Sequence, residues 1–143
     1  MNNVKVVPNF HFRGNAKQAI ELYQKAFGAE VKVLMCDPDS ENDLVWHAEV
    51  YLGNQRVTMT DDPEMLVPNS HPMSLLLSFE TDEDVKNSYD VLADGATIIY
   101  PMQATEYSTC FVKLVDKFGM LWVLLTEPEN YECLESKSTD ALG

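Results

Sequence analysis

Hydrophobic and polar residues in the first half of the chain follow a pattern that predicts strand, helix, strand, strand and strand. A β-rich stretch over residues 4–12 precedes a helix that has Asn15 as its N-cap and ends at Phe27, and in this helix apolar side chains recur every three or four residues. Gly28 can end this helix in the left-handed conformation. Three strands are expected next, over 30–36, 45–52 and 55–60. Between the last two lies Gly53-Asn54, a dipeptide suited to a two-residue hairpin turn.

The second half of the chain has the same order of elements. A strand over 74–80 leads into a helix that ends near Ala93, with Thr81 as its N-cap and Asp84 three residues later. Three further strands are expected over 96–100, 110–115 and 121–126. Because helices and strands mix here without strict alternation, we predict the α+β class.

The two halves also correspond residue by residue at a shift of about 66 positions. The shift places the inward side of the first helix (Ala19, Leu22, Tyr23, Ala26) on that of the second (Val85, Ser88, Tyr89, Leu92). It also places the strand residues Val57, Met59, Thr60 and Asp61 on Val123, Leu125, Thr126 and Glu127. We therefore expect one domain made of two βαβββ modules with a ligand cleft between them. The expected segments are module 1–62, linker 63–73, module 74–127 and polar tail 128–143.

Composition limits the partners of this protein. The formal net charge of −13 disfavours nucleic acid and anionic membranes, and it favours either simple solubility or a cationic ligand. The three cysteines (Cys36, Cys110, Cys133) are far apart and form no CxxC pair, which predicts free thiols in a reducing compartment. Without a signal-peptide pattern or a membrane-length apolar run, we expect a cytoplasmic protein.

Several segments resemble the glyoxalase/bleomycin-resistance superfamily, also called the vicinal oxygen chelate superfamily, and within it the PhnB-like group. They are Phe12-Arg-Gly-Asn-Ala16, Phe27-Gly28, Trp46-His-Ala-Glu49, Asp61, Pro101-Met-Gln103 and Asp116-Lys-Phe-Gly-Met-Leu-Trp122. The last segment is the most specific. That group also carries the label 3-demethylubiquinone-9 3-methyltransferase. The resemblance implies a curved mixed sheet with a concave cleft, helices behind it, and a homodimer.

The resemblance also places four metal-ligand positions on the first and last strands of the modules. In this sequence they fall near Pro8, Val57, Leu75 and Val123, none of which offers a donor to a divalent ion. We therefore expect no metal. The absence of a GxGxxG turn gives no support to a nucleotide-type cofactor, so no cofactor is expected.

Candidate ligand-binding residues come from both modules. His47 could act as a general base or hydrogen-bond a ligand, although a two-residue turn at Gly53-Asn54 would put it on the helix side and Trp46 on the cleft side. Asp61 ends a strand and could hold a cation, or it could simply be solvated. The remaining candidates are Met59, Gln103, Tyr107 and Trp122, of which Met59 and Trp122 could equally be core residues.

The favoured function is metal-free binding of a small molecule, in a resistance-type protein whose ligand is unknown and could be cationic. The first alternative is a metal-dependent lyase or dioxygenase that uses other ligands, such as His47, Asp61 and His71. The second is a structural dimeric module without a ligand. The sequence assigns no catalytic residue.

Overall fold

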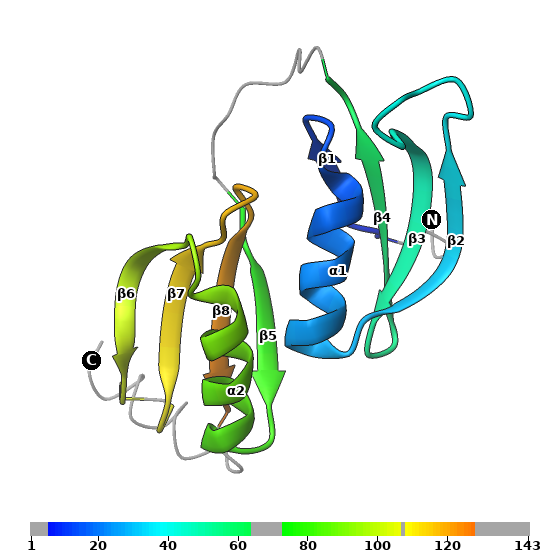
Figure 1. Ribbon diagram of the computed structural model, residues 1–143. Helices are drawn as coiled ribbons and strands as arrows, with labels where there is room; N and C mark the ends of the chain where they lie inside the picture. The colour runs from blue at the N-terminus through cyan, green and yellow to red at the C-terminus, as the bar shows by residue number, and fades with distance from the viewer. Residues whose placement is uncertain (1–5, 64–72, 107, 128–143) are drawn as a thin grey trace. The chain divides into compact units, whose positions relative to one another are not determined.

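The computed structural model describes residues 6–63, 73–106 and 108–127, and it divides the chain into two compact units between Ser70 and His71. Each unit contains one helix and one four-stranded mixed sheet (Figure 1). The predicted α+β fold of two βαβββ modules is confirmed. Neither helix in the described part of the chain is long and apolar enough to cross a membrane.

The first module has its elements in the predicted order. They are β1 (Asn9–Phe12), α1 (Ala16–Phe27), β2 (Glu30–Cys36), β3 (Val45–Leu52) and β4 (Gln55–Asp61). The strands lie in the order β1-β4-β3-β2, with β1 parallel to β4 and the other neighbours antiparallel. The first strand is shorter than the predicted 4–12. The helix ends, as predicted, at Gly28, whose φ of 66° is left-handed.

The second module repeats this topology. Its elements are β5 (Leu75–Phe79), α2 (Asp82–Leu92), β6 (Thr97–Gln103), β7 (Phe111–Val115) and β8 (Leu121–Thr126). The strand order β5-β8-β7-β6 matches that of the first sheet, and β5 is again parallel to β8. Thr81 is the predicted N-cap of α2, since its Oγ1 accepts a 3.1 Å hydrogen bond from the backbone N–H of Asp84.

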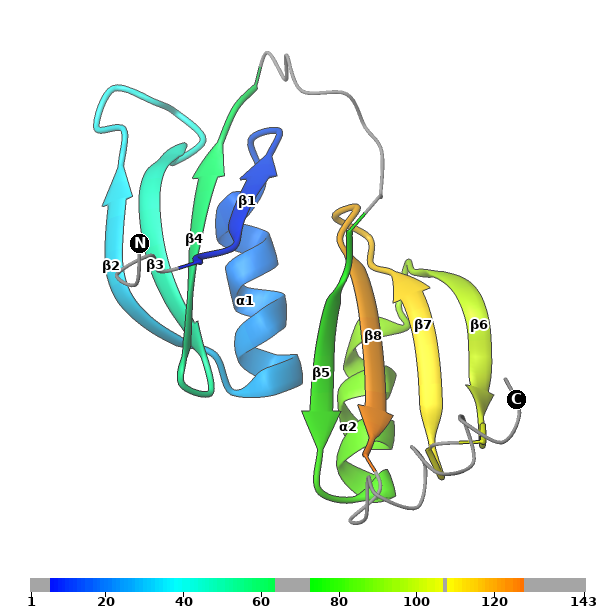
Figure 2. The same ribbon diagram turned by 180° about the vertical axis from the view of Figure 1, so that it is seen from behind.

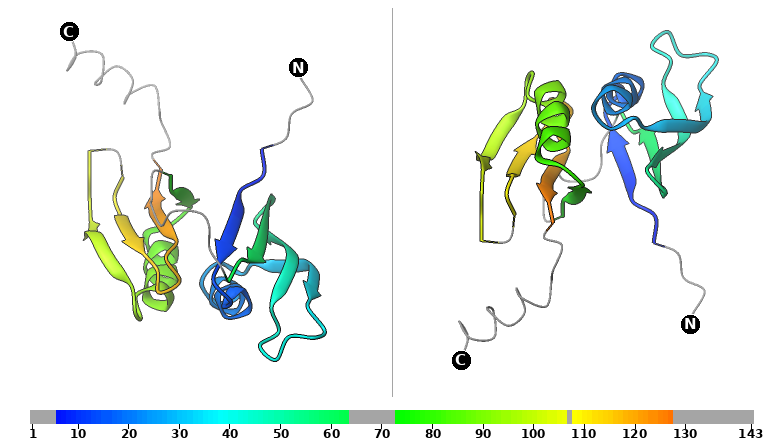
Figure 3. Two further views of the ribbon diagram at one scale, coloured as in Figure 1. Left: turned by 90° about the horizontal axis from the view of Figure 1, so that it is seen from above. Right: turned by 90° about the horizontal axis from the view of Figure 1, so that it is seen from below.

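Each helix lies along one face of its own sheet, as the front and back views show (Figures 1 and 2) and as the end-on views confirm (Figure 3). We call this side of a sheet its helix face and the opposite side its far face. The first helix face is built from buried apolar side chains of three strands: Phe10, Phe12, Ala48, Val50, Val57 and Met59. Burial of each large apolar side chain contributes about 1.5–3 kcal/mol, so this layer supplies most of the module's stability.

The repeat predicted from the sequence holds for the helices but fails for the last strands. Ala19 and Val85, which the shift superposes, are both fully buried. Val57, however, pairs with the helix-face residue Val50, whereas Val123 pairs with Lys113 on the far face. Trp122, one position earlier than the repeat predicts, is the residue of β8 that faces the helix. A slip of one residue exchanges the two faces of a strand, so this part of the predicted correspondence is wrong.

The difference arises in the turns before these strands. The pair Leu52 and Gln55 closes on the two-residue turn Gly53-Asn54, as predicted. In the second module the pair Val115 and Leu121 encloses a longer loop. The two hairpins therefore cannot be aligned with one constant shift.

Candidate functional site

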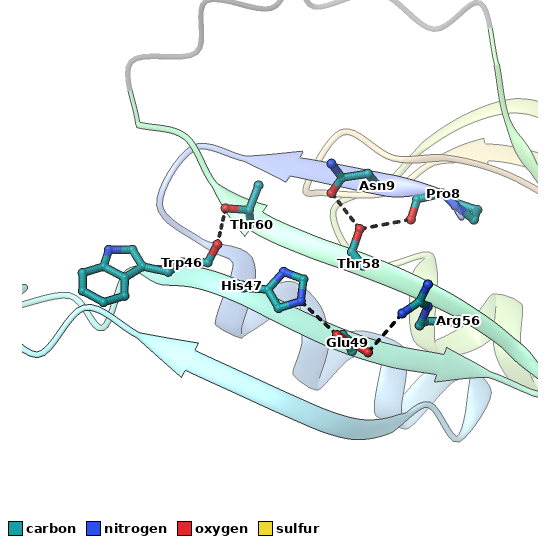
Figure 4. A network of polar contacts seen from close by, with 8 residues as sticks. All are labelled: Pro8, Asn9, Trp46, His47, Glu49, Arg56, Thr58 and Thr60. Atoms are coloured by element: carbon teal, nitrogen blue, oxygen red, sulfur yellow. Dashed lines mark hydrogen bonds and ion pairs between the residues drawn. The ribbon is translucent and has the colours of Figure 1, made fainter. Parts of the chain in front are cut away.

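Polar side chains gather on the far face of the first module (Figure 4). They come from three adjacent strands, and strand pairing brings them into one layer, because residues opposite each other in a sheet point to the same face. Asn9 lies opposite Thr58, which in turn lies opposite Glu49. We call the following residues of this layer the polar face: Asn9, His11, His47, Glu49, Arg56, Thr58 and Thr60.

Glu49 is the centre of the polar face. Its Oε2 lies 3.1 Å from His47 Nε2, and its Oε1 accepts a hydrogen bond of 3.5 Å from Arg56 Nη1. A carboxylate only accepts, so the histidine nitrogen must be the donor in the first contact. The hydrogen bond from His47, followed by that from Arg56, holds the pKa of the Glu49 carboxyl below its usual value. The Glu49 carboxylate thus accepts a hydrogen bond on both sides, from His47 and from Arg56.

Two threonines tie the strands of the polar face together. Thr58 Oγ1 donates to Asn9 Oδ1 at 2.9 Å, which joins β4 to β1. Thr60 Oγ1 donates to the carbonyl oxygen of Trp46 at 2.8 Å, which joins β4 to β3. These bonds hold the side chains and the start of β3 in a defined arrangement, so a ligand would meet a largely preformed surface.

His47 lies on the far face, which corrects the predicted arrangement of β3. Ala48 and Val50 pair with Met59 and Val57, and all four lie on the buried helix face. An irregularity at the start of β3, where the pairing with β2 shifts between Met35 and Cys36, explains why Trp46 does not share the helix face with Ala48 and Val50. Val45 and Ala48 are both buried, so Trp46 and His47 are the two residues turned away from the helix.

The two positions expected for metal ligands in the second module, Leu75 and Val123, do not share a face. Val57 is fully buried on the helix face, and Leu75 pairs with the buried Trp122, whereas Val123 lies on a far face. Among the described residues, no group of three or more His, Cys, Asp or Glu side chains is arranged to hold a metal ion.

Two of the alternative metal ligands, His47 and Asp61, serve different parts of the first module. His47 belongs to the polar face, whereas the carboxylate of Asp61 reaches the N-terminus of α1, and His71 lies outside the described residues.

Asp61 has a structural task. Its Oδ1 accepts hydrogen bonds from the backbone N–H groups of Gly14 (2.9 Å) and Ala16 (3.0 Å), and its Oδ2 accepts one from Val45 at 2.8 Å. One carboxylate therefore satisfies the start of α1 and the start of β3 together. Asn15 was predicted as the N-cap of α1, but its side chain makes no capping bond, and Asp61 takes that role.

Trp122 also has a structural task. Its side chain is fully buried, and its indole Nε1 donates a 2.8 Å hydrogen bond to Asp116 Oδ2. The other oxygen of Asp116 accepts from the backbone N–H groups of Phe118 (2.8 Å) and Met120 (3.1 Å). In this way the most specific segment of the resemblance closes the β7–β8 loop and anchors it to the core.

The remaining predicted site residues are scattered. Met59 is fully buried in the core of the first module, and Gln103 is exposed at the end of the edge strand β6. Tyr107 lies outside the described residues. Trp46 is 57% exposed and stands beside the polar face at the start of β3 (Figure 4).

Sequence reasoning missed most of the polar face. It selected His47 and Trp46 but not Glu49, Arg56 or Thr58. The signal that could have found them is the alternation on β3 and β4, where buried Ala48 and Val50 are interleaved with polar neighbours.

The fold defines the class of this protein. Two βαβββ modules with the same strand order form an α+β fold of the vicinal oxygen chelate type, found in glyoxalase and bleomycin-resistance proteins. More narrowly, the chain belongs to the family described as 3-demethylubiquinone-9 3-methyltransferase, whose model matches residues 4–125. That description names a reaction, but the match shows the family and not the reaction.

Individual relatives agree with this assignment. Protein YjdN of Escherichia coli K12 is 28% identical over 134 residues, which cover 82% of this chain and 91% of YjdN. The structure of a PhnB protein from Bacillus cereus, described as a putative 3-demethylubiquinone-9 3-methyltransferase, has a TM-score of 0.76 at 25% identity, over 86% of this chain and 99% of that one. A glyoxylase/bleomycin resistance protein/dioxygenase domain from Frankia shows the same fold with a TM-score of 0.65, at 14% identity over 90% of this chain and all of that domain.

Proposed function

We propose that this protein binds a small organic molecule on the polar face of its first module, as a metal-free binding or resistance-type member of its superfamily. The observation that carries the proposal is the cluster of His47, Glu49 and Arg56 on a sheet surface, joined by contacts of 3.1 and 3.5 Å. Ion pairs on a protein surface stabilise the fold very little, so a cluster held in place by neighbouring strands is better explained by recognition.

The composition of the face supports recognition of a molecule with both polar and apolar parts. Ligand sites combine apolar walls with a few placed polar groups. Here the polar groups are fixed by Thr58 and Thr60, while Trp46 offers an exposed aromatic surface next to them.

A comparison of three forms of the protein tests this function. The wild type, Thr58→Phe and Lys113→Phe would each be incubated with a small-molecule extract of Escherichia coli K12, washed, and analysed by mass spectrometry. Thr58 lies in the middle of the polar face, so a phenyl ring there should block it without touching the helix-face core. Lys113 lies on the far face of the second module and is the matched control.

The proposal expects compounds that are enriched by the wild type and by Lys113→Phe, but lost by Thr58→Phe. Equal thermal melting of the three forms would show that folding is intact. Equal enrichment by all three forms, or no enrichment by any, would contradict binding at this face.

A further inference from the structure

We infer that the bound molecule carries an anionic oxygen-rich group, such as a carboxylate or a phosphate, and an apolar or aromatic body about 10 Å long. This inference rests on the proposed function, because it names the chemistry of the molecule that the polar face binds. The net charge of −13 suggested a cationic ligand, whereas the polar face points to an anionic one.

The balance of hydrogen-bond donors and acceptors on the polar face favours a ligand that accepts hydrogen bonds. Both oxygens of Glu49 are already engaged, one by His47 and one by Arg56. A guanidinium has five N–H groups, and in the described part of the chain Arg56 uses its side chain for the single 3.5 Å bond to Glu49. Asn9 accepts from Thr58 through its oxygen, which leaves its amide N–H groups as donors. The face therefore offers a surplus of donors.

Most of the carboxylates of the first module lie away from the polar face or are paired. Much of the acidity of the first module lies in the loop between β2 and β3, which contains Asp37, Asp39, Glu41 and Asp43. The carboxylate of Asp61 is bound to three backbone N–H groups. On the sheet itself Glu49 is paired with Arg56, and Glu30 is paired with Lys32 at 2.9 Å. The net charge of −13 thus does not extend to the polar face, where the guanidinium of Arg56 favours an oxyanion.

An exposed apolar surface at one end of the polar face favours a ligand with an apolar part. The indole of Trp46 projects from the start of β3 (Figure 4), and Met35, which is 51% exposed, lies opposite His47 on the neighbouring strand. Trp46 and Glu49 are three residue steps apart on β3, about 10 Å at the rise of an extended strand. The guanidinium of Arg56 reaches the Glu49 carboxylate at 3.5 Å, so it lies at about the same distance from Trp46. A molecule that contacts both Arg56 and Trp46 must span roughly this length, which is the scale of a small aromatic acid.

A matched set of probes tests the sign of the charge. These are 4-phenylbutyrate, 4-phenylbutan-1-ol and 4-phenylbutylamine, which share an aryl body and differ in the charge of the head. The sequence contains two tryptophans, and Trp122 is fully buried, so a fluorescence change that disappears in Trp46→Phe reports binding at the polar face. We expect 4-phenylbutyrate to bind about tenfold more tightly than the amine, as a charge-assisted hydrogen bond would give.

Variants of Arg56 locate the source of this preference. Arg56→Gln should lower the affinity for 4-phenylbutyrate about tenfold, and Arg56→Lys should recover part of that loss. The control Lys113→Gln should leave the affinity unchanged. If the amine binds as tightly as the acid with a signal that depends on Trp46, the inference is wrong and the proposed function stands. If none of the three probes changes the Trp46 signal, the inference is overturned, and a negative extract experiment would then remove the proposed function as well.

Discussion

The two modules have the same strand order but opposite chemistry on their far faces. In the first module the far-face positions of β4 are Arg56, Thr58 and Thr60, and they contact Glu49, Asn9 and the backbone of Trp46. In the second module the corresponding strand, β8, presents Leu121, Val123 and Leu125, of which the last two are only 7% and 3% exposed. A repeated scaffold thus keeps its topology while, among the described residues, the polar cluster lies on the sheet of the first copy.

The same contrast appears where each helix begins. In the first module the carboxylate comes from the last strand, since Asp61 accepts from the backbone at Gly14 and Ala16. In the second module the carboxylate is on the helix, where Asp82 accepts from the hydroxyl of Thr126 on the last strand at 3.2 Å. The accepting carboxylate lies on the last strand in the first module and on the helix in the second. In both modules the hydrogen bonds join the last strand to the start of the helix.

The largest expected effect is on the second module, from Asp116→Ala. The change removes the acceptor of three hydrogen bonds and leaves the indole N–H of Trp122 buried without that partner. We expect a loss of about 2–4 kcal/mol in the free energy of unfolding. Urea denaturation of a Trp46→Phe background, where Trp122 is the remaining tryptophan, measures it. The exposed Asp94→Ala is the control, and a loss no larger than that of the control would show that Asp116 does not anchor this loop.

A smaller loss is expected in the first module from Asp61→Ala. Three backbone N–H groups lose their acceptor, but they are only partly buried, so water can replace the carboxylate in part. We expect about 1–3 kcal/mol, with faster amide hydrogen exchange at Ala16 and Val45. The exposed Glu21→Ala on the same module serves as control. Unchanged exchange at both amides would contradict the anchoring role of Asp61.

The polar face itself should matter little for stability. The contact between Arg56 and Glu49 is 3.5 Å long and partly exposed, and pairs of this kind contribute about 0–1 kcal/mol. Arg56→Gln should therefore shift the thermal midpoint only slightly. A destabilisation comparable to that of Asp61→Ala would instead assign these residues to the fold and weaken the case for recognition.

The smallest effect is the titration of Glu49. Hydrogen bonds from His47 and Arg56 lower the pKa of its carboxyl in the folded state. The resulting stabilisation is present above the pKa of the unfolded chain and is lost as the pH falls through the folded pKa. Carbon NMR of the Glu49 carboxyl should show a midpoint below that of a free glutamate, and His47→Ala should raise it. If His47→Ala leaves the titration midpoint of Glu49 unchanged, the contact with His47 is not made in solution.

Local patterns in the sequence were enough to predict the order of the elements. The helix stripe of Ala19 and Tyr23, the turn at Gly53-Asn54 and the cap at Thr81 all depend on residues close together in the chain, and all three are found in the structure. The α+β class followed from them.

The faces of the strands could not be predicted in the same way. The irregularity before Ala48 and the unequal hairpins of the two modules each move side chains by one position, and one position is enough to exchange the faces. Asp61 was read as a free strand-end carboxylate, because its partners Gly14 and Ala16 are far away in the sequence. Glu49 and Arg56 lie only seven residues apart on the predicted hairpin, and they were missed because the opposite side of the sheet was expected to face the ligand.

Backbone amide chemical shifts during titration with 4-phenylbutyrate compare the two modules most directly. If the first module alone carries the binding chemistry, the shifts will concentrate on β3 and β4, around His47, Glu49 and Arg56, and will leave β7 and β8 unchanged. Shifts centred on Val123 and Leu125 of the second module would contradict that account.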